Sequence, residues 1–140
     1  MDKITFSAQS LENPQLLPPL ALAYIGDAVY ELAVRRYLIE NGLVRSNRLH
    51  RETVKYVRAG AQAEALAVLA AVLTEEEATM VRRGRNAKML HVPKGSSATE
   101  YRHSTAFECL IGFLYLKGDL TRLNEVLEIV TDVLNEQRGE

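Results

Sequence analysis

This sequence has little cysteine and no long apolar run, and each shortage excludes a class of protein. The 140-residue chain holds one cysteine, Cys109, so no disulfide can form within it, and a reducing compartment is expected. The longest apolar run, residues 65–73, is about half as long as a membrane-crossing helix requires. The first residues, MDKITFSAQ, lack the basic-then-apolar pattern of a secretory signal. The expected protein is cytoplasmic and has no membrane span.

The composition and the positions of residues that start and end helices predict an all-α protein. With 47% hydrophobic and 25% charged residues, the composition is that of a globular domain. Prolines at 18 and 19 open a helix that Asn41 and Gly42 can close, and Thr74 and Glu77 form a capping box. Further helices are expected over 46–57, 61–73, 99–117 and from 119 onward, with N-caps at Ser46 and Asp119, a break at Gly60 and a loop over 91–97. The prediction is a bundle of about six to seven helices over residues 18–140, preceded by an N-terminal extension, residues 1–17.

Two acidic residues stand in helical runs that are otherwise apolar. Asp27 lies in LALAYIGDAVYEL and Glu108 in STAFECLIGFLYL, with Gly26 and Gly112 close by. A carboxylate drawn toward an apolar interior is costly unless something pairs with it. These acids either meet arginine or tyrosine partners inside the bundle, or converge on Mg²⁺, which prefers hard oxygen ligands and commonly takes one or two carboxylates. The glycines permit close approach of two helices in either case.

Positive charge is gathered in two segments although the net charge is only −1. Residues 45–58 and 82–103 are strongly basic, whereas the chain from 119 onward is acidic. One end of the molecule could therefore be basic and bind a polyanion; the alternative is a set of solvated helix faces. The candidates for phosphate contact are Arg82, Arg83, Arg85, Lys88 and Lys94, followed by Arg48, Arg51 and Lys55.

Two motifs carry a resemblance to a known family. The stretch YIGDAVYEL resembles the signature helix of ribonuclease III, and STAFECLIGFLYL resembles the second acidic helix of that family. With RRGRNAK and VPK, the chain is similar over about residues 18 to 135 to the Mini-III ribonucleases, which have only the helical catalytic domain. The resemblance implies a ribonuclease III-like helical bundle, with Asp27 and Glu108 as the catalytic and metal-binding residues.

Part of the acidic set of the larger ribonuclease III enzymes is absent. Their further acids are replaced here by Leu20, Ala23 and Thr105. The resemblance therefore implies one firmly held Mg²⁺ in each site, for which Mn²⁺ can substitute. Glu31, one turn after Asp27, either assists through a water molecule or pairs with Arg35.

The resemblance also implies a substrate and an assembly. It implies an endoribonuclease that cleaves double-stranded RNA by metal-assisted hydrolysis and trims both ends of precursor 23S ribosomal RNA, acting as a homodimer through the signature helix. No additional duplex-binding domain is expected, so a ribosomal protein bound to the substrate is a possible partner. The alternative is a catalytically silent RNA-binding or ribosome-associated module, which would keep the basic segments but would not need both acids.

Overall fold

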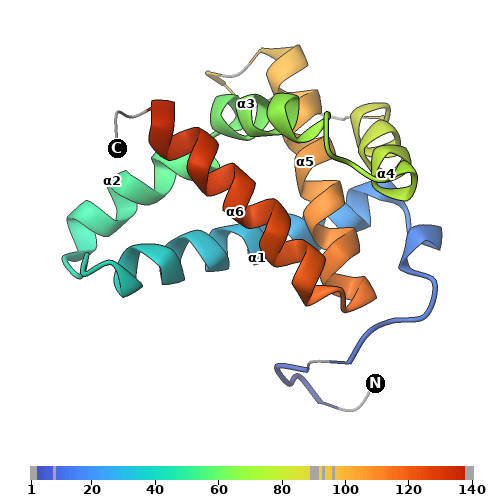
Figure 1. Ribbon diagram of the computed structural model, residues 1–140, viewed down its shortest axis with the longest axis horizontal. Helices are drawn as coiled ribbons and strands as arrows, with labels where there is room; N and C mark the ends of the chain where they lie inside the picture. Colours follow the sequence, from blue (N-terminus) through green and yellow to red (C-terminus); the bar gives the residue numbers. More distant parts are fainter. Residues whose placement is uncertain (1–2, 8, 89–91, 93, 96, 138–140) are drawn as a thin grey trace.

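The computed structural model describes residues 3–7, 9–88, 92, 94–95 and 97–137. Within these residues the chain forms six α-helices and one short 3₁₀ helix, with no strand, which confirms the predicted all-α class (Figure 1). The elements are η1 (Pro14–Leu16), α1 (Pro19–Glu40), α2 (Ser46–Val57), α3 (Ala59–Leu69), α4 (Glu75–Arg85), α5 (Ala98–Lys117) and α6 (Leu120–Gln137). No helix of this part of the chain is long and apolar enough to span a membrane.

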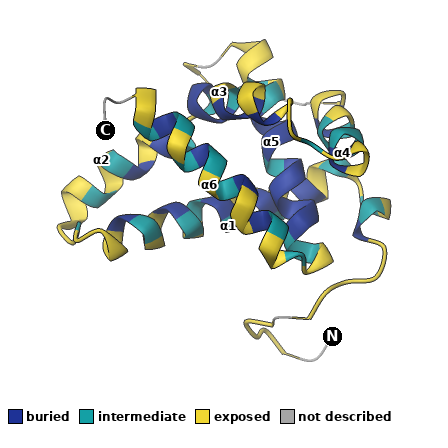
Figure 2. Cartoon of the chain, in the orientation of Figure 1, coloured by how far each residue is buried: buried dark blue, intermediate teal, exposed yellow. Residues whose placement is uncertain are grey.

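Helix α5 is the centre of the bundle. Every residue from Ser104 to Leu114 is buried except Glu108, and α1, α3, α4 and α6 all pack against this helix. Figure 2 shows the buried residues concentrated on α5 and on the sides of the other helices that face it. A helix that is apolar on nearly every side belongs inside the protein, which explains why STAFECLIGFLYL shows no polar face. Glu108 is thus the one incompletely buried position in the middle of the core helix.

Helices α1 and α5 cross with their backbones in contact. A Cβ atom built on Gly26 would clash with the carbonyl oxygen of Glu108 and would lie 2.8 Å from the amide nitrogen of Gly112. A Cβ atom on Gly112 would clash in turn with the carbonyl oxygen of Leu22. The close approach expected from the two glycines is confirmed, because only residues without a side chain fit at this crossing.

The predicted helix caps are mostly confirmed. The Thr74 hydroxyl accepts a hydrogen bond from the Glu77 amide, and the Glu77 carboxylate accepts one from the Thr74 amide, which completes the capping box of α4. The Asp119 carboxylate accepts a hydrogen bond from the Arg122 amide and caps α6. The Ser46 cap is wrong, because α2 begins at Ser46 and the residue before it, which has extended backbone angles, is the N-cap.

The boundary between α2 and α3 lies two residues before the predicted break. Arg58 has an extended conformation, with ψ of 151°, while Gly60 is buried inside α3, so the prediction of a break at Gly60 is wrong. Side chains from other helices satisfy the last two carbonyls of α2. The Tyr30 hydroxyl donates to one and the Gln62 amide to the other, each at 3.0 Å. Tertiary contacts therefore end this helix.

The segment before α1 is attached to the ends of two helices. The Leu11 amide donates to the Leu116 carbonyl at 2.8 Å, at the end of α5. The guanidinium of Arg83, on α4, donates to the carbonyls of Gln15 and Leu17, the second at 2.8 Å. Arg83 therefore connects α4 to the residues that lead into α1.

Candidate active site

The two acids singled out in the sequence come together where α1 crosses α5. Asp27 lies on α1 directly after Gly26, and Glu108 supplies the α5 carbonyl that Gly26 contacts. Glu108 is half-buried, whereas Asp27 is exposed to solvent, so the expectation that both acids lie in apolar surroundings is wrong for Asp27. The site therefore lies at the protein surface on the Asp27 side and borders the buried core on the Glu108 side.

The Glu108 carboxyl resists ionisation. Burial raises its pKa, and the neighbouring Asp27 carboxylate raises it further, while a hydrogen bond from Gln62 acts in the opposite direction; the resulting pKa is about 8. Within the described residues, no lysine, arginine or histidine forms an ion pair with either acid. The described part of the chain therefore leaves this pair of carboxylates without an ion-pairing cation.

The donor set fits a hard divalent cation. Asp27 and Glu108 provide carboxylate oxygens from two helices that are fixed relative to each other by the glycine crossing. No group of three or more histidine, cysteine or acidic residues with metal-binding geometry occurs in the described part of the chain. Two carboxylates suffice for Mg²⁺, which keeps several water ligands and often takes only one or two protein ligands. The residues present therefore match this ion, and they do not match a structural zinc site.

The raised pKa of Glu108 predicts a pH-dependent stability in the absence of metal. An unfolded glutamate has a pKa of about 4.3. Between that value and about 8, the folded chain holds a proton that the unfolded chain has released. Glu108 therefore adds most to the free energy of unfolding when the pH is below its pKa in the unfolded chain. This contribution is lost as the pH rises toward its pKa in the folded chain. We expect the wild-type protein in EDTA to lose about 2 kcal/mol of stability from this group between about pH 6 and pH 8.

Urea denaturation in EDTA at the two pH values tests this expectation. In the Glu108→Gln variant this contribution is absent, so its stability is expected to change less over the same interval. Equal pH dependence in the two proteins would show that Glu108 ionises normally.

Two further residues lie near the acids, Glu31 and Gln62, and only the interaction of Glu31 was predicted from the sequence. Glu31 pairs with Arg35 at 2.7 Å on the surface of α1, as one of the two sequence alternatives stated. Gln62, which donates to Glu108 from α3 at 3.3 Å, was not predicted. Its only sequence signal is an amide in the alanine-rich stretch AGAQAEALAVL, and the contact depends on how α3 packs against α5.

The basic candidates occupy different environments. Arg82, Arg85, Lys88 and Lys94 are exposed on or after α4, and Arg48, Arg51 and Lys55 are exposed on α2. Lys55 pairs with Glu52 at 2.7 Å. Arg83 is the exception, because it is half-buried and its guanidinium binds the carbonyls of the N-terminal segment.

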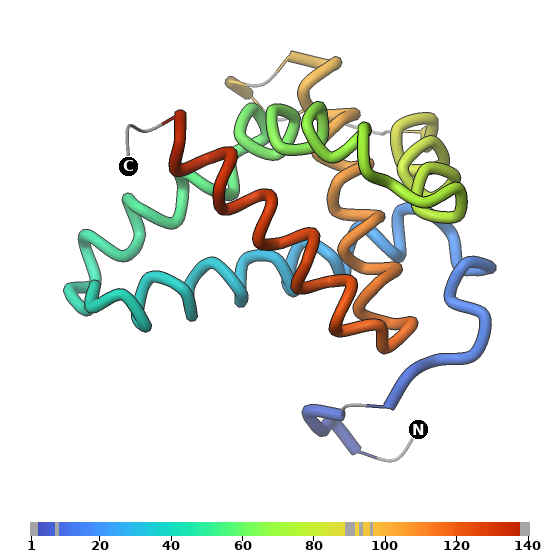
Figure 3. Tube along the Cα trace, in the orientation of Figure 1, coloured from blue at the N-terminus to red at the C-terminus, as the bar shows by residue number. Residues whose placement is uncertain are grey.

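The two basic helices are not neighbours. Helix α2 packs on α1 and α3, whereas α4 packs on α5 and α1, and the two lie at opposite ends of the molecule in Figure 3. The expectation that the two basic segments form one basic end of the molecule is therefore wrong for α2 and α4, because these helices pack against different partners at opposite ends. Any polyanion that contacts both must extend across the molecule.

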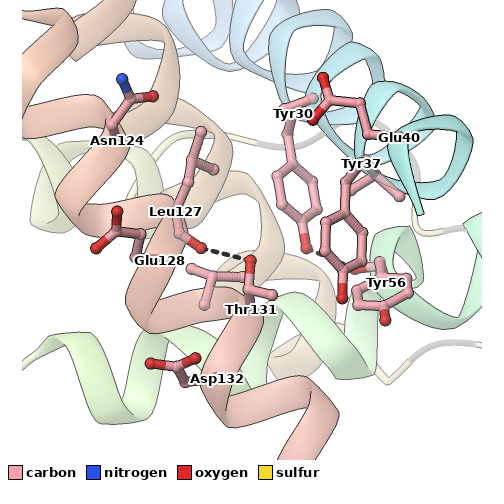
Figure 4. A pocket seen from close by; sticks show the side chains of 12 residues that line it. Tyr30, Tyr37, Glu40, Tyr56, Asn124, Leu127, Glu128, Thr131 and Asp132 are labelled. Carbon is pink, nitrogen blue, oxygen red and sulfur yellow. Dashed lines mark hydrogen bonds between the residues drawn. The ribbon is translucent and has the colours of Figure 1, made fainter.

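A pocket of about 560 Å³ lies apart from the two acids, between α1, the end of α2 and α6 (Figure 4). Three tyrosines from α1 and α2 face Leu127 and Thr131 of α6 across it: Tyr30, Tyr37 and Tyr56. The hydroxyl of Tyr56 and that of Tyr37 both bond to the Asn135 side chain, at 2.6 and 2.8 Å. Neither Asp27 nor Glu108 lines this pocket.

A comparison of the sequence with protein families assigns this arrangement of helices and acids to a class. Residues 20–119 match the Ribonuclease III domain family. The matched range contains both acids and the α1–α5 crossing. The chain belongs to the ribonuclease III family and is an endoribonuclease.

Comparison with individual proteins narrows the assignment. The chain is 52% identical over 130 residues to Mini-ribonuclease 3 of Symbiobacterium thermophilum, covering 93% of this chain and 98% of that protein. It is 46% identical over 134 residues to Mini-ribonuclease 3 of a Thermoanaerobacter species, covering 90% and 94%. A crystal structure of a Fusobacterium nucleatum protein superposes with a TM-score of 0.78 at 27% identity, covering 86% of this chain and 98% of that one. Its place in the family is therefore among the Mini-ribonuclease 3 proteins, which confirms the resemblance seen in the motifs.

Proposed function

We propose that this endoribonuclease cleaves double-stranded RNA and uses Asp27 and Glu108 to hold a Mg²⁺ ion for phosphodiester hydrolysis. The observation that carries the proposal is the meeting of these two carboxylates at the α1–α5 crossing, without an ion-pairing cation in the described part of the chain. Mg²⁺, when bound, supplies a Lewis acid for the phosphate oxygens and lowers the pKa of a water molecule. Mn²⁺ is expected to substitute, because it accepts the same oxygen ligands.

The residues around the acids have separate tasks in this proposal. Exposed Asp27 lies where a large substrate can reach it, and the core wall around Glu108 restricts the motion of its carboxylate. Basic side chains are proposed to bind the phosphates of the duplex, whose shallow minor groove is recognised by shape and backbone. They are Arg82, Arg85, Lys88 and Lys94, then Arg48, Arg51 and Lys55, with Arg83 as the least accessible member of the set.

The natural substrate in this proposal is precursor 23S ribosomal RNA in the cytoplasm, cut at both ends of its terminal stem. This narrower assignment rests on the Mini-III resemblance, which also motivates a ribosomal protein on the precursor as an assisting partner. Residues 18–140 are proposed as the catalytic domain.

A cleavage assay tests the proposal directly. An end-labelled RNA duplex and its single strands are incubated with the protein in Mg²⁺, in EDTA, and in EDTA followed by excess Mg²⁺. Cleavage of the duplex alone, lost in EDTA and recovered with Mg²⁺, is the expected result, because two carboxylates cannot hydrolyse a phosphodiester without the ion. Cleavage that persists in EDTA would contradict the metal site. Binding without cleavage, even of a precursor stem, would indicate the catalytically silent module.

The proposal includes a two-fold dimer through α1. Four apolar side chains are exposed along one side of this helix: Leu20, Tyr24, Leu32 and Ile39. Tyr24 is 83% exposed, which is unusual for an aromatic residue in the middle of a helix. Exposed apolar side chains on one side of a helix, with the Glu31–Arg35 ion pair among them, suit an isologous contact with a second copy. Two copies bring the two sites that cutting both strands needs.

Sedimentation equilibrium tests the dimer. The wild-type protein is expected to be dimeric at micromolar concentration, and Tyr24→Glu is expected to be monomeric because it replaces the most exposed of the four apolar side chains with a charge. Val68→Glu on α3 is the matched control, since Val68 is also exposed and apolar but lies on another helix. A monomeric wild type, or a dimeric Tyr24→Glu, would contradict this interface.

A further inference from the structure

Gln62 is a buried amide whose orientation is fixed by its neighbours. Only 1% of the residue is exposed. Its Nε2 atom lies 3.0 Å from the Val57 carbonyl oxygen and 3.3 Å from the Glu108 Oε2 atom. The Val57 carbonyl can only accept, and the ionised form of Glu108 that binds a metal is an acceptor too, so the amide nitrogen faces both.

This orientation leaves the other end of the amide without a partner. The Oε1 atom of Gln62 is buried and has no hydrogen bond within the described residues. A buried acceptor left in this state costs about 1–3 kcal/mol, and native proteins contain few of them. An unbranched apolar side chain of the same length would avoid that cost, but it would also remove the hydrogen bond that the amide donates to the Val57 carbonyl at the end of α2. The bond to Val57 uses only one of the two amide hydrogens, so it does not account for the second contact, to Glu108.

Gln62 is also an uncharged hydrogen-bond donor to Glu108. A lysine or arginine at this place would neutralise Glu108 and compete with a metal ion for the carboxylate. An apolar residue would leave the carboxylate without a donor. A neutral donor orients the carboxylate and leaves its charge available, which is the usual role of groups that hydrogen-bond to metal ligands.

We propose that Gln62 is a positioning residue that holds the Glu108 carboxylate ready to bind the metal ion. This inference rests on the proposed function of Asp27 and Glu108. The amide reaches Glu108 from α3, so a third helix joins α1 and α5 in building the site. The unpaired Oε1 atom follows from this task, because the amide nitrogen must point at the two acceptors.

The test compares metal affinity with stability in the same variants. Gln62→Met keeps the length of the side chain and removes the donor, and Gln62→Leu is a second variant with a different shape. Binding of Mn²⁺ to the RNA-free protein is followed by the electron paramagnetic resonance signal of the free ion, and the melting temperature is measured in EDTA. Thr53→Val is the matched control, because Thr53 is also buried and its hydroxyl donates to the Leu49 carbonyl within its own helix, α2.

The expected result separates positioning from packing. Gln62→Met is expected to bind Mn²⁺ about 10-fold more weakly, with a melting temperature in EDTA close to that of the wild type, because the lost hydrogen bond to Val57 is offset by removal of the unpaired Oε1 atom. Cleavage by this variant is expected to recover when the metal concentration is raised. Thr53→Val is expected to keep the wild-type affinity. An unchanged affinity in both Gln62 variants, or a weaker affinity that only accompanies a lower melting temperature, would overturn the role of Gln62.

Mn²⁺ binding by wild type and by Asp27→Asn distinguishes a failure of the proposed metal site from a failure of the role proposed for Gln62. If wild-type protein does not bind Mn²⁺, or if Asp27→Asn binds it as well as wild type does, the metal site itself is wrong and the role of Gln62 falls with it. If Asp27→Asn loses the ion while both Gln62 variants keep it, only the inference about Gln62 is wrong.

Discussion

Asp27→Asn and Glu108→Gln are each expected to lose RNA cleavage by at least about 100-fold, which is the order of effect of removing one electrostatic contributor to a transition state. Each substitution keeps the shape of the side chain and removes one charged oxygen ligand from a site where the described residues place two carboxylates. Because no third acidic ligand occurs nearby within the described residues, neither loss can be compensated. The measurement is the initial rate of duplex cleavage at saturating Mg²⁺.

Stability provides the check that these variants fail for the proposed reason. The two carboxylates repel each other in the absence of a cation, and part of the raised pKa of Glu108 comes from Asp27. Removing either charge is therefore expected to leave the melting temperature in EDTA unchanged or higher. Glu31→Gln is the matched control, since Glu31 lies one turn from Asp27 but is paired with Arg35. Near-normal cleavage by Asp27→Asn or Glu108→Gln would mean that the ion, if present, is held elsewhere.

Local signals in the sequence were sufficient to predict most of the helices and to single out the two acids as candidate site residues. Proline, glycine and capping residues act on their own neighbourhood, so the start of α1 at Pro19 and the capping box at Thr74 were predicted correctly. Glycines beside Asp27 and Glu108 correctly indicated a close crossing, because few other features bring a glycine into an apolar helix. The resemblance to ribonuclease III then supplied the role of the two acids, which spacing alone left open.

The remaining features depend on contacts between distant segments. The exposure of Asp27 follows from the side of α1 that packs against α5, and the apolar composition around it does not reveal that side. Arg83 looked like its basic neighbours, but its guanidinium turns toward carbonyls 66 and 68 residues away in the sequence. The Tyr56 carbonyl at the end of α2 likewise accepts a hydrogen bond from the hydroxyl of Tyr30, 26 residues earlier in the chain. Residue type and spacing carry no information about such partners.

Gly26→Ala and Gly112→Ala are expected to be the most destabilising single-methyl changes in this chain. Each new Cβ atom would meet the backbone of the opposite helix, which cannot turn aside as a side chain can. Overpacking usually costs about 1–3 kcal/mol, and clashes with backbone lie at the upper end of that range or beyond. Alanine returns at most about 1 kcal/mol of helix propensity. We expect a fall in melting temperature of about 10 °C, measured by circular dichroism.

The control for this prediction is another helical glycine. In Gly60→Ala the new methyl group would meet mainly the mobile end of the Arg58 side chain, so this variant is expected to melt at or above the wild-type temperature. A Gly26→Ala protein as stable as wild type would show that α1 and α5 can separate easily. Separation would still have a functional consequence, because Asp27 follows Gly26 directly and Glu108 is the residue that Gly26 contacts. Any movement that accommodates the methyl group moves the two carboxylates apart, so cleavage at saturating Mg²⁺ should fall even in the fraction that remains folded.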